Sequence, residues 1–123
     1  IAVEPENTFE ASVEAVKACL RRTGVSLNSI DLFEIGEAFA AEAILIKDAL
    51  KISDEKFNIW GGDLAVGHPL GAAGARILVT LIKALEDRRL NRGLCAIAYG
   101  GGGAVCMIIE NCRLDVPLFP KTK

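Results

Sequence analysis

The sequence predicts an α/β fold with a mixed sheet, formed as one domain over residues 1–123. Segments with helical periodicity alternate with segments of strand periodicity, which is typical of helices packed on a sheet. Two apolar runs near the C-terminus are separated by glycines and predict an antiparallel hairpin in that sheet. Apolar residues make up 51% of the 123, which is enough for one hydrophobic core.

Two long helices are predicted by apolar residues that recur at helical spacing. The first runs from Thr8, which we expect to cap its N-terminus, to Gly24, which we expect to end it. The second covers residues 72–90 and finishes in a basic turn, which suits the negative end of a helix dipole. The residues expected to face the core are Phe9, Val13, Val16, Leu20, Ile77, Leu78, Leu81, Ile82 and Leu85.

Between these helices the sequence predicts a strand, a third helix and a loop. Residues 30–35 alternate apolar and acidic side chains as a strand does. The strand leads through Gly36 into an alanine-rich helix that continues to Lys51. Residues 57–60 are a short strand candidate, and residues 61–71 are predicted to be a loop because of their glycines and proline.

The last part of the chain predicts the hairpin and a tail. Residues 93–99 and 104–110 have the composition of two buried strands, and Gly100–Gly103 form the turn between them. Residues 113–123 contain two prolines and end in lysines, so we expect an irregular tail there.

Composition excludes several classes of function. With 14 basic and 16 acidic side chains, the chain has no basic run able to follow a phosphate backbone, so nucleic acid is not an expected partner. Its apolar runs are too short to span a membrane and no signal peptide is evident, which predicts a cytoplasmic protein. Its four cysteines lack C-x-x-C spacing, so we expect reduced thiols, mostly in the core, and no metal site.

The only histidine, His68, lies within the glycine-rich segment GGDLAVGHPLGAAGAR, residues 61–76. Glycines allow close backbone approach, and Pro69 fixes the chain just after the histidine. The predicted helix that follows directs unpaired N–H groups towards the loop, an environment that suits a thiolate or an oxyanion. The spacing alone is equally compatible with a catalytic base and with an ordinary turn residue that caps a helix.

A second glycine cluster, Gly100–Gly103, joins the two predicted C-terminal strands. Four consecutive glycines exceed what a tight turn requires, so they favour backbone N–H groups offered to a ligand oxygen. The alternative is a flexible hairpin tip. If both glycine-rich loops lie at one edge of the sheet, they form a single pocket.

Three segments in this order, EIGEAFAAE, GGDLAVGHPLGAAGAR and YGGGGAVCMIIE, resemble the C-terminal half of the thiolases over residues 8–110. Thiolases are acyl-CoA acyltransferases of fatty-acid and ketone metabolism. The resemblance implies an α/β/α layered domain that takes part in 3-ketoacyl-CoA thiolysis or the reverse Claisen condensation. It also implies a homo-oligomer whose substrate is a coenzyme A thioester, without a metal or redox cofactor.

The resemblance assigns roles to individual residues. His68 matches the histidine that serves the nucleophilic cysteine and helps to bind a thioester oxygen. Gly100 matches the glycine whose N–H contributes to the other oxyanion hole. These two are therefore the expected catalytic residues. The expected substrate-binding residues are Gly36, Phe39, Gly67, Pro69 and Gly101.

The sequence also departs from the family pattern. Gly36 stands where the family has an asparagine that positions an oxyanion-hole water, and Ala98 stands where it has a second catalytic cysteine. Cys95 and Tyr99 lie at odd offsets from Ala98, so strand alternation predicts that both point to the opposite face. Two further changes are Trp60 at a usual asparagine and Asp63 at a usual small residue.

No segment resembles the one that carries the family's nucleophilic cysteine. We therefore expect an N-terminal half, in the same or another chain, to supply it, and we expect this chain alone to be inactive. The family strand that precedes this region is also missing, which predicts an open sheet edge. The alternative is a degenerate domain that binds acyl-CoA or acts as a scaffold. Acyl chain length and reaction direction stay open.

Overall fold

The computed structural model describes residues 1–112, and its three strands form one mixed sheet in the order β1-β2-β3. Strand β1 (Leu32–Ile35) runs parallel to β2 (Arg92–Tyr99), which pairs antiparallel with β3 (Gly103–Glu110). Between β1 and β2, Leu32 lies opposite Gly93. Between β2 and β3, the pairing ends with Tyr99 opposite Gly103. The predicted mixed sheet and its C-terminal hairpin are confirmed.

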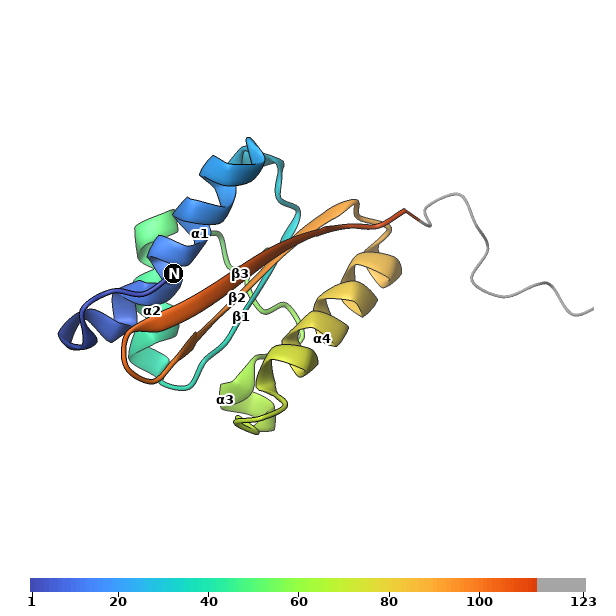
Figure 1. Cartoon of the computed structure of the whole chain (residues 1–123). Coiled ribbons are helices and arrows are strands. Elements are labelled where there is room, and N and C mark those ends of the chain that lie inside the picture. The colour runs from blue at the N-terminus through green and yellow to red at the C-terminus, as the bar shows by residue number, and fades with distance from the viewer. Residues whose placement is uncertain (113–123) are drawn as a thin grey trace, which may run out of the picture.

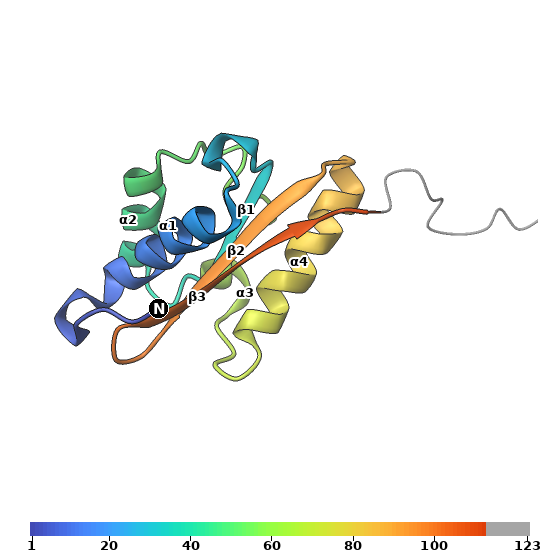
Figure 2. The same ribbon diagram turned by 45° about the horizontal axis from the view of Figure 1, so that its top comes forward.

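Helices cover both faces of the sheet (Figure 1). Helices α1 (Ala11–Thr23) and α2 (Ala40–Leu50) lie on one side, and α4 (Ala73–Arg88) lies on the other, as the second view also shows (Figure 2). Alternate residues of β2 supply the two cores. Leu94 packs towards α1 and α2, whereas Cys95 packs towards α4. The arrangement is the helix, sheet, helix layering that the sequence predicts.

The start of the first helix differs from the prediction. Thr8 is not its N-cap but lies inside a 3-10 helix, Pro5–Glu10, from which α1 continues. Pro5 has a fixed φ and no N–H to satisfy, so it begins this tighter turn three residues earlier. The predicted end is confirmed, because Gly24 adopts a φ of 71° and its N–H bonds to Leu20 O.

The segment between α2 and α4 corrects two further expectations. The strand candidate 57–60 makes a single bridge, between Phe57 and Phe33, because Asn58 turns the chain with a φ of 44°. The predicted loop 61–71 contains a one-turn helix, α3 (Asp63–Val66). Gly67 closes that turn through its N–H to Asp63 O and leaves it with a φ of 94°.

Strand β3 is less buried than the sequence suggests. Val105 and Met107 are half exposed, because β3 is the last strand and α4 covers mainly β1 and β2. On its outer side, β3 is bonded at its start by the N-terminal residues, through the bridge between Ala2 and Gly103 and backbone hydrogen bonds between Ile1 and Ala104. Within residues 1–112 no other segment pairs with this edge, and an open sheet edge in the protein stays a prediction.

Two further expectations concern the C-terminal tail and membrane-spanning helices. The tail predicted at residues 113–123 is outside the described part of the chain. None of the helices between residues 1 and 112 has both the length and the apolar character needed to cross a bilayer.

Candidate active site

A cavity of about 770 Å³ opens where the His68 loop and the β2–β3 turn approach each other. His68, Leu70 and Gly74 border it on one side, and Gly100 and Gly101 border it on the other. The two glycine-containing loops therefore share one pocket, as the sequence predicts. The remaining lining residues are Pro5, Thr8, Phe9, Ala38, Phe39, Glu42, Ile97, Ala98 and Tyr99.

His68 is held by a buried carboxylate. Its Nδ1 lies 2.9 Å from Oδ2 of Asp63, the first residue of α3. The amide of Glu37 donates to the same oxygen at 2.8 Å, and Arg76 Nη2 donates to Oδ1 at 2.5 Å. Burial opposes ionisation of Asp63, but these three donors outweigh it and hold the pKa of the carboxyl below its usual range. Asp63 is therefore an anion at neutral pH.

A second set of hydrogen bonds fixes the loop against the end of β1. Asn58 accepts from the Ile35 amide at 2.7 Å and donates to Glu37 Oε1 at 2.7 Å. The other oxygen of Glu37 accepts from the Leu64 amide at 3.1 Å. Gly62 has no room for a side chain, because a Cβ there would overlap the Glu37 carboxylate. The loop that carries His68 is thus anchored by buried side chains, not only by its glycines.

Arg76 lies between Asp63 and a second buried acid, Glu34 on β1. Glu34 is 2% exposed, and its Oε1 is 3.9 Å from Arg76 Nη1 without a hydrogen bond in the described chain. Burial raises the pKa of Glu34 to about 8, although Arg76 opposes that rise. At neutral pH Glu34 is therefore largely protonated, and the charge of Arg76 is balanced chiefly by Asp63.

Glu42 is a further buried acid, and it lines the cavity itself. Ser12 Oγ donates to its Oε1 at 3.0 Å across the contact between α1 and α2. Burial raises the pKa of Glu42. Nearby, the ring of Phe39 packs edge-on against Phe9 with centroids 5.6 Å apart, which forms an apolar wall.

The absence of a side chain at Gly36 is explained by the closeness of Ile97 on β2. A Cβ at this position would come within 2.8 Å of Ile97 Cγ1. Ile97 lines the cavity, whereas Gly36 does not. The isoleucine therefore fills space next to the backbone where the family pattern has an asparagine side chain.

The five expected substrate-binding residues divide into two groups. Phe39 and Gly101 line the cavity, whereas Gly36, Gly67 and Pro69 do not. Gly67 instead ends α3, and the carbonyl of Pro69 accepts from the amides at the start of α4. Contact of any of the five with substrate stays a prediction.

The end of β2 decides which side chains reach the cavity. Ala98 lines it, and Cys95 lies on the opposite face among residues of α4, as alternation predicts. Burial raises the pKa of the Cys95 thiol to about 11. Tyr99 also borders the cavity, and alternation predicts that its side chain points to the face opposite Ala98. The strand ends there, and the ring lies over Gly103, where a Cβ would overlap it.

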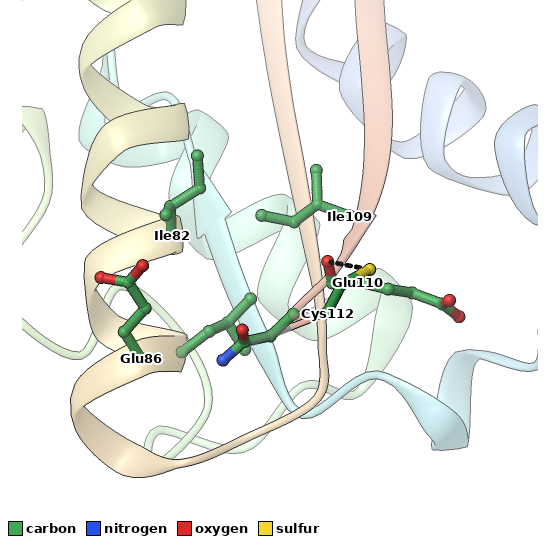
Figure 3. Close-up of a pocket in the computed structure, with 7 residues that line it drawn as sticks. Ile82, Glu86, Ile109, Glu110 and Cys112 are labelled. Atoms are coloured by element: carbon green, nitrogen blue, oxygen red, sulfur yellow. Dashed lines mark hydrogen bonds between the residues drawn. The ribbon is translucent and has the colours of Figure 1, made fainter. Parts of the chain in front are cut away.

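A second cavity, of about 440 Å³, lies between α4 and the end of β3 (Figure 3). Ile82 and Ile109 give it an apolar floor. Its acids are engaged elsewhere, since Glu86 pairs with Lys83 and Glu110 with Arg92. The Cys112 thiol donates to a backbone carbonyl at 3.7 Å. This cavity has no base beside a free nucleophile among the described residues, so the first cavity is the candidate active site.

A family model described as thiolase, C-terminal domain, matches residues 1–111. The chain belongs to the thiolase family. Among its relatives, a probable acetyl-CoA acyltransferase of Staphylococcus aureus is 43% identical over 111 residues. The cytosolic acetyl-CoA acetyltransferase of Mus musculus is 46% identical over 108 residues. These matches cover 90% and 88% of this chain but 28% and 27% of the relatives.

Solved thiolase structures have the same fold as this domain. The crystal structure of the Bacillus anthracis acetyl-CoA acetyltransferase superposes with a TM-score of 0.86 at 37% identity. The Acat5 thiolase from Ascaris suum in complex with coenzyme A gives 0.83 at 40% identity. Each match covers 89% of this chain and 28% of the solved chain. The predicted thiolase-type α/β/α fold is confirmed, and the chain spans less than a third of the length of its relatives.

The three segments that carry the resemblance meet in space in this thiolase domain. Residues 34–42 supply the acids at the end of β1, residues 61–76 supply His68, and residues 99–110 begin with the glycine turn. Sequence reasoning did not identify Asp63 as the partner of His68, nor Glu42 as a cavity residue. The available signal for Asp63 was an acidic side chain, five residues before the histidine, at a position where the family pattern has a small residue. Nothing in the spacing pointed to Glu42.

Two other expectations concern cysteines and metals. Within residues 1–112 all four thiols are free, with Cys95 buried and Cys112 exposed. No group of three or more His, Cys, Asp or Glu in the described chain is arranged to hold a metal ion.

Proposed function

We propose that this chain is the C-terminal half of an acyl-CoA acyltransferase in which His68 activates a cysteine supplied by an N-terminal half. The observation that carries the proposal is the meeting of His68 with Gly100 and Gly101 at one cavity. His68 offers a base, and the glycines offer backbone without side chains in the way. Family membership and the acetyl-CoA names of the relatives support the same substrate class.

In the proposed reaction the thiol proton of the cysteine passes to His68, and the thiolate attacks the thioester carbon. The carbonyl oxygen becomes an oxyanion that backbone N–H groups such as that of Gly100 stabilise. Collapse of this intermediate breaks the bond to the coenzyme A sulfur, which leaves as a thiolate and takes up a proton. The acyl group remains on the cysteine for transfer to a second substrate.

Ala98 restricts which second step follows. Its methyl group cannot exchange a proton, so the family's thiol acid/base is absent from this cavity. We propose that the chain favours steps that need no such thiol: acyl transfer to a heteroatom, thioester hydrolysis, or condensation with a carbanion formed by decarboxylation.

The second candidate function is acyl-CoA binding or scaffolding without catalysis. Ala98 and Gly36 favour it, since both lack the functional side chain of the family pattern. A thiolase structure with bound coenzyme A supports this class of ligand in either case. For both candidates we propose a cytoplasmic homo-oligomer, a location suggested by the mouse relative that is named cytosolic.

The test begins with native mass spectrometry of the purified protein, which identifies any chain that supplies the N-terminal half. Release of coenzyme A from acetyl-CoA is then measured for the parent and for His68→Ala. We expect the substitution to reduce turnover about 100-fold or more, because a general base is lost. Lys83→Ala is the control, since Lys83 is exposed on α4 and its ion pair within residues 1–112 is with Glu86.

Turnover that survives His68→Ala unchanged would overturn the catalytic proposal. Binding of coenzyme A without turnover in the assembled parent would establish the second candidate instead.

A further inference from the structure

We propose that Asp63 is a positioning residue for His68, which holds the neutral imidazole with its proton on Nδ1 and leaves Nε2 bare at the cavity. The inference rests on the proposed function, because it names the ring nitrogen that acts as the base in the proposed reaction. It concerns a residue that stands where the family pattern has a small side chain.

The local backbone brings the two residues together. Asp63 begins α3, and the single turn ends at Gly67. The φ of 94° at Gly67 reverses the chain, so His68 folds back over the start of the same turn. The result is a 2.9 Å contact between His68 Nδ1 and Asp63 Oδ2 across five residues of sequence.

Asp63 is itself held on both oxygens. Its side chain is fully buried, with Arg76 Nη2 at 2.5 Å from Oδ1 and the Glu37 amide at 2.8 Å from Oδ2. These donors come from α4 and from the segment after β1, so two different parts of the fold hold the carboxylate. The carboxylate therefore has one orientation in which it can receive the histidine.

The protonation of the ring follows from this arrangement. An ionised carboxylate only accepts hydrogen bonds, so Nδ1 must be the donor in the contact with Asp63. A neutral imidazole has one ring proton, and Nε2 is then an acceptor. Nε2 makes no hydrogen bond to the described residues, and His68 lines the cavity. It is thus the atom placed to take a proton from a nucleophile.

The tautomer can be measured directly by nitrogen NMR, in which the signals lost in the His68→Ala variant identify the two ring nitrogens of His68 among those of any other histidine in the intact protein. The chain is labelled with [15N]histidine within the intact protein, and the two ring nitrogens are observed at a pH where the imidazole is neutral. We expect the form protonated at Nδ1 to dominate. A His68 ring protonated mainly at Nε2 in the parent would overturn the proposal.

Asp63→Asn preserves the shape of the side chain but removes its charge, so the preference for Nδ1–H should weaken. We expect the ratio of the two tautomers to change about tenfold, as loss of a charge-assisted hydrogen bond predicts. Asp54→Asn is the matched control, because Asp54 is exposed and pairs with Lys47 instead of His68. An unchanged ratio in Asp63→Asn, or an equal change in Asp54→Asn, would contradict the proposal.

This measurement also separates the inference from the proposed function. The expected tautomer in a protein that does not transfer acyl groups would uphold the role of Asp63 and reject the catalytic function. Acyl transfer in a protein whose His68 carries its proton on Nε2 would uphold the catalytic function and reject the role of Asp63.

Discussion

Arg76 Nη2 on α4 lies 2.5 Å from Oδ1 of Asp63 on α3, and the other carboxylate oxygen of Asp63 lies 2.9 Å from His68 Nδ1. The pair joins the 16-residue helix α4 to the one-turn helix α3, and the Asp63 side chain in it is fully buried. Its charges are compensated mainly by each other, since the third group nearby, Glu34, has a pKa of about 8. The integrity of the candidate site therefore depends on this contact.

The first prediction concerns the stability of that pair. Arg76→Ala leaves the Asp63 carboxylate buried without its cation, and we expect the free energy of unfolding to fall by about 3 kcal/mol. Urea denaturation measures the change. Lys83→Ala, which removes an exposed ion pair with Glu86, should cost less than about 1 kcal/mol. Equal losses in the two variants would show that burial of the Asp63 pair has no energetic consequence.

The second prediction concerns pH and Glu34. Burial raises its pKa from 4.5 to about 8, so the folded state retains a proton that the unfolded state releases. Its contribution to stability is complete below about pH 4.5 and is lost as pH rises towards about 8. The free energy of unfolding should thus decline by up to about 1.4 kcal/mol per pH unit in that window.

Glu34→Gln removes this titration while keeping the size of the side chain. Urea midpoints at several values between about pH 5 and pH 8 should decline less steeply in the variant than in the parent. Parallel pH profiles for the two proteins would contradict the assignment of the slope to Glu34.

The third prediction tests the fit between Gly36 and Ile97. A methyl group at Gly36 meets Ile97 Cγ1 at 2.8 Å, so Gly36→Ala should destabilise the fold by about 1–3 kcal/mol through overpacking. Ile97→Ala removes the opposing atoms. A double-mutant cycle should therefore give a cost for the pair at least about 1 kcal/mol below the sum of the single costs. Strict additivity would mean that Ile97 does not limit the side chain at position 36.

The fourth prediction concerns the buried contact of Ser12 with Glu42. Ser12→Ala deprives the Glu42 carboxyl of its hydrogen-bond donor at 3.0 Å, and we expect a loss of about 1–3 kcal/mol. Thr23→Ala is a suitable control, because its hydroxyl bonds to the backbone at the exposed end of α1. A smaller loss at Ser12 than at Thr23 would show that the buried bond adds no stability.

Much of the fold follows from local patterns in the sequence. The helical spacing of Ile77 and Leu81 predicts α4, and the apolar runs on either side of Gly100–Gly103 predict the hairpin. Gly24 ends α1 because its left-handed conformation suits glycine. Such features depend on near neighbours in the chain, which is why a single sequence is sufficient for them.

The parts that were wrong or missed depend on particular backbone angles and on distant contacts. The strand candidate fails at Asn58, whose φ of 44° is set by side-chain bonds to Ile35 and Glu37. Asp63 contacts His68 only after the turn at Gly67. None of these relationships has a periodicity that the sequence displays.

The central claim is that His68 activates a cysteine that accepts an acyl group, and the intact mass of the protein after reaction with acetyl-CoA tests it most directly. The account predicts an acetyl group covalently attached to a cysteine of the N-terminal half in the parent, and no such adduct in His68→Ala on the same time scale. Equal acetylation of the parent and the His68→Ala variant would contradict it.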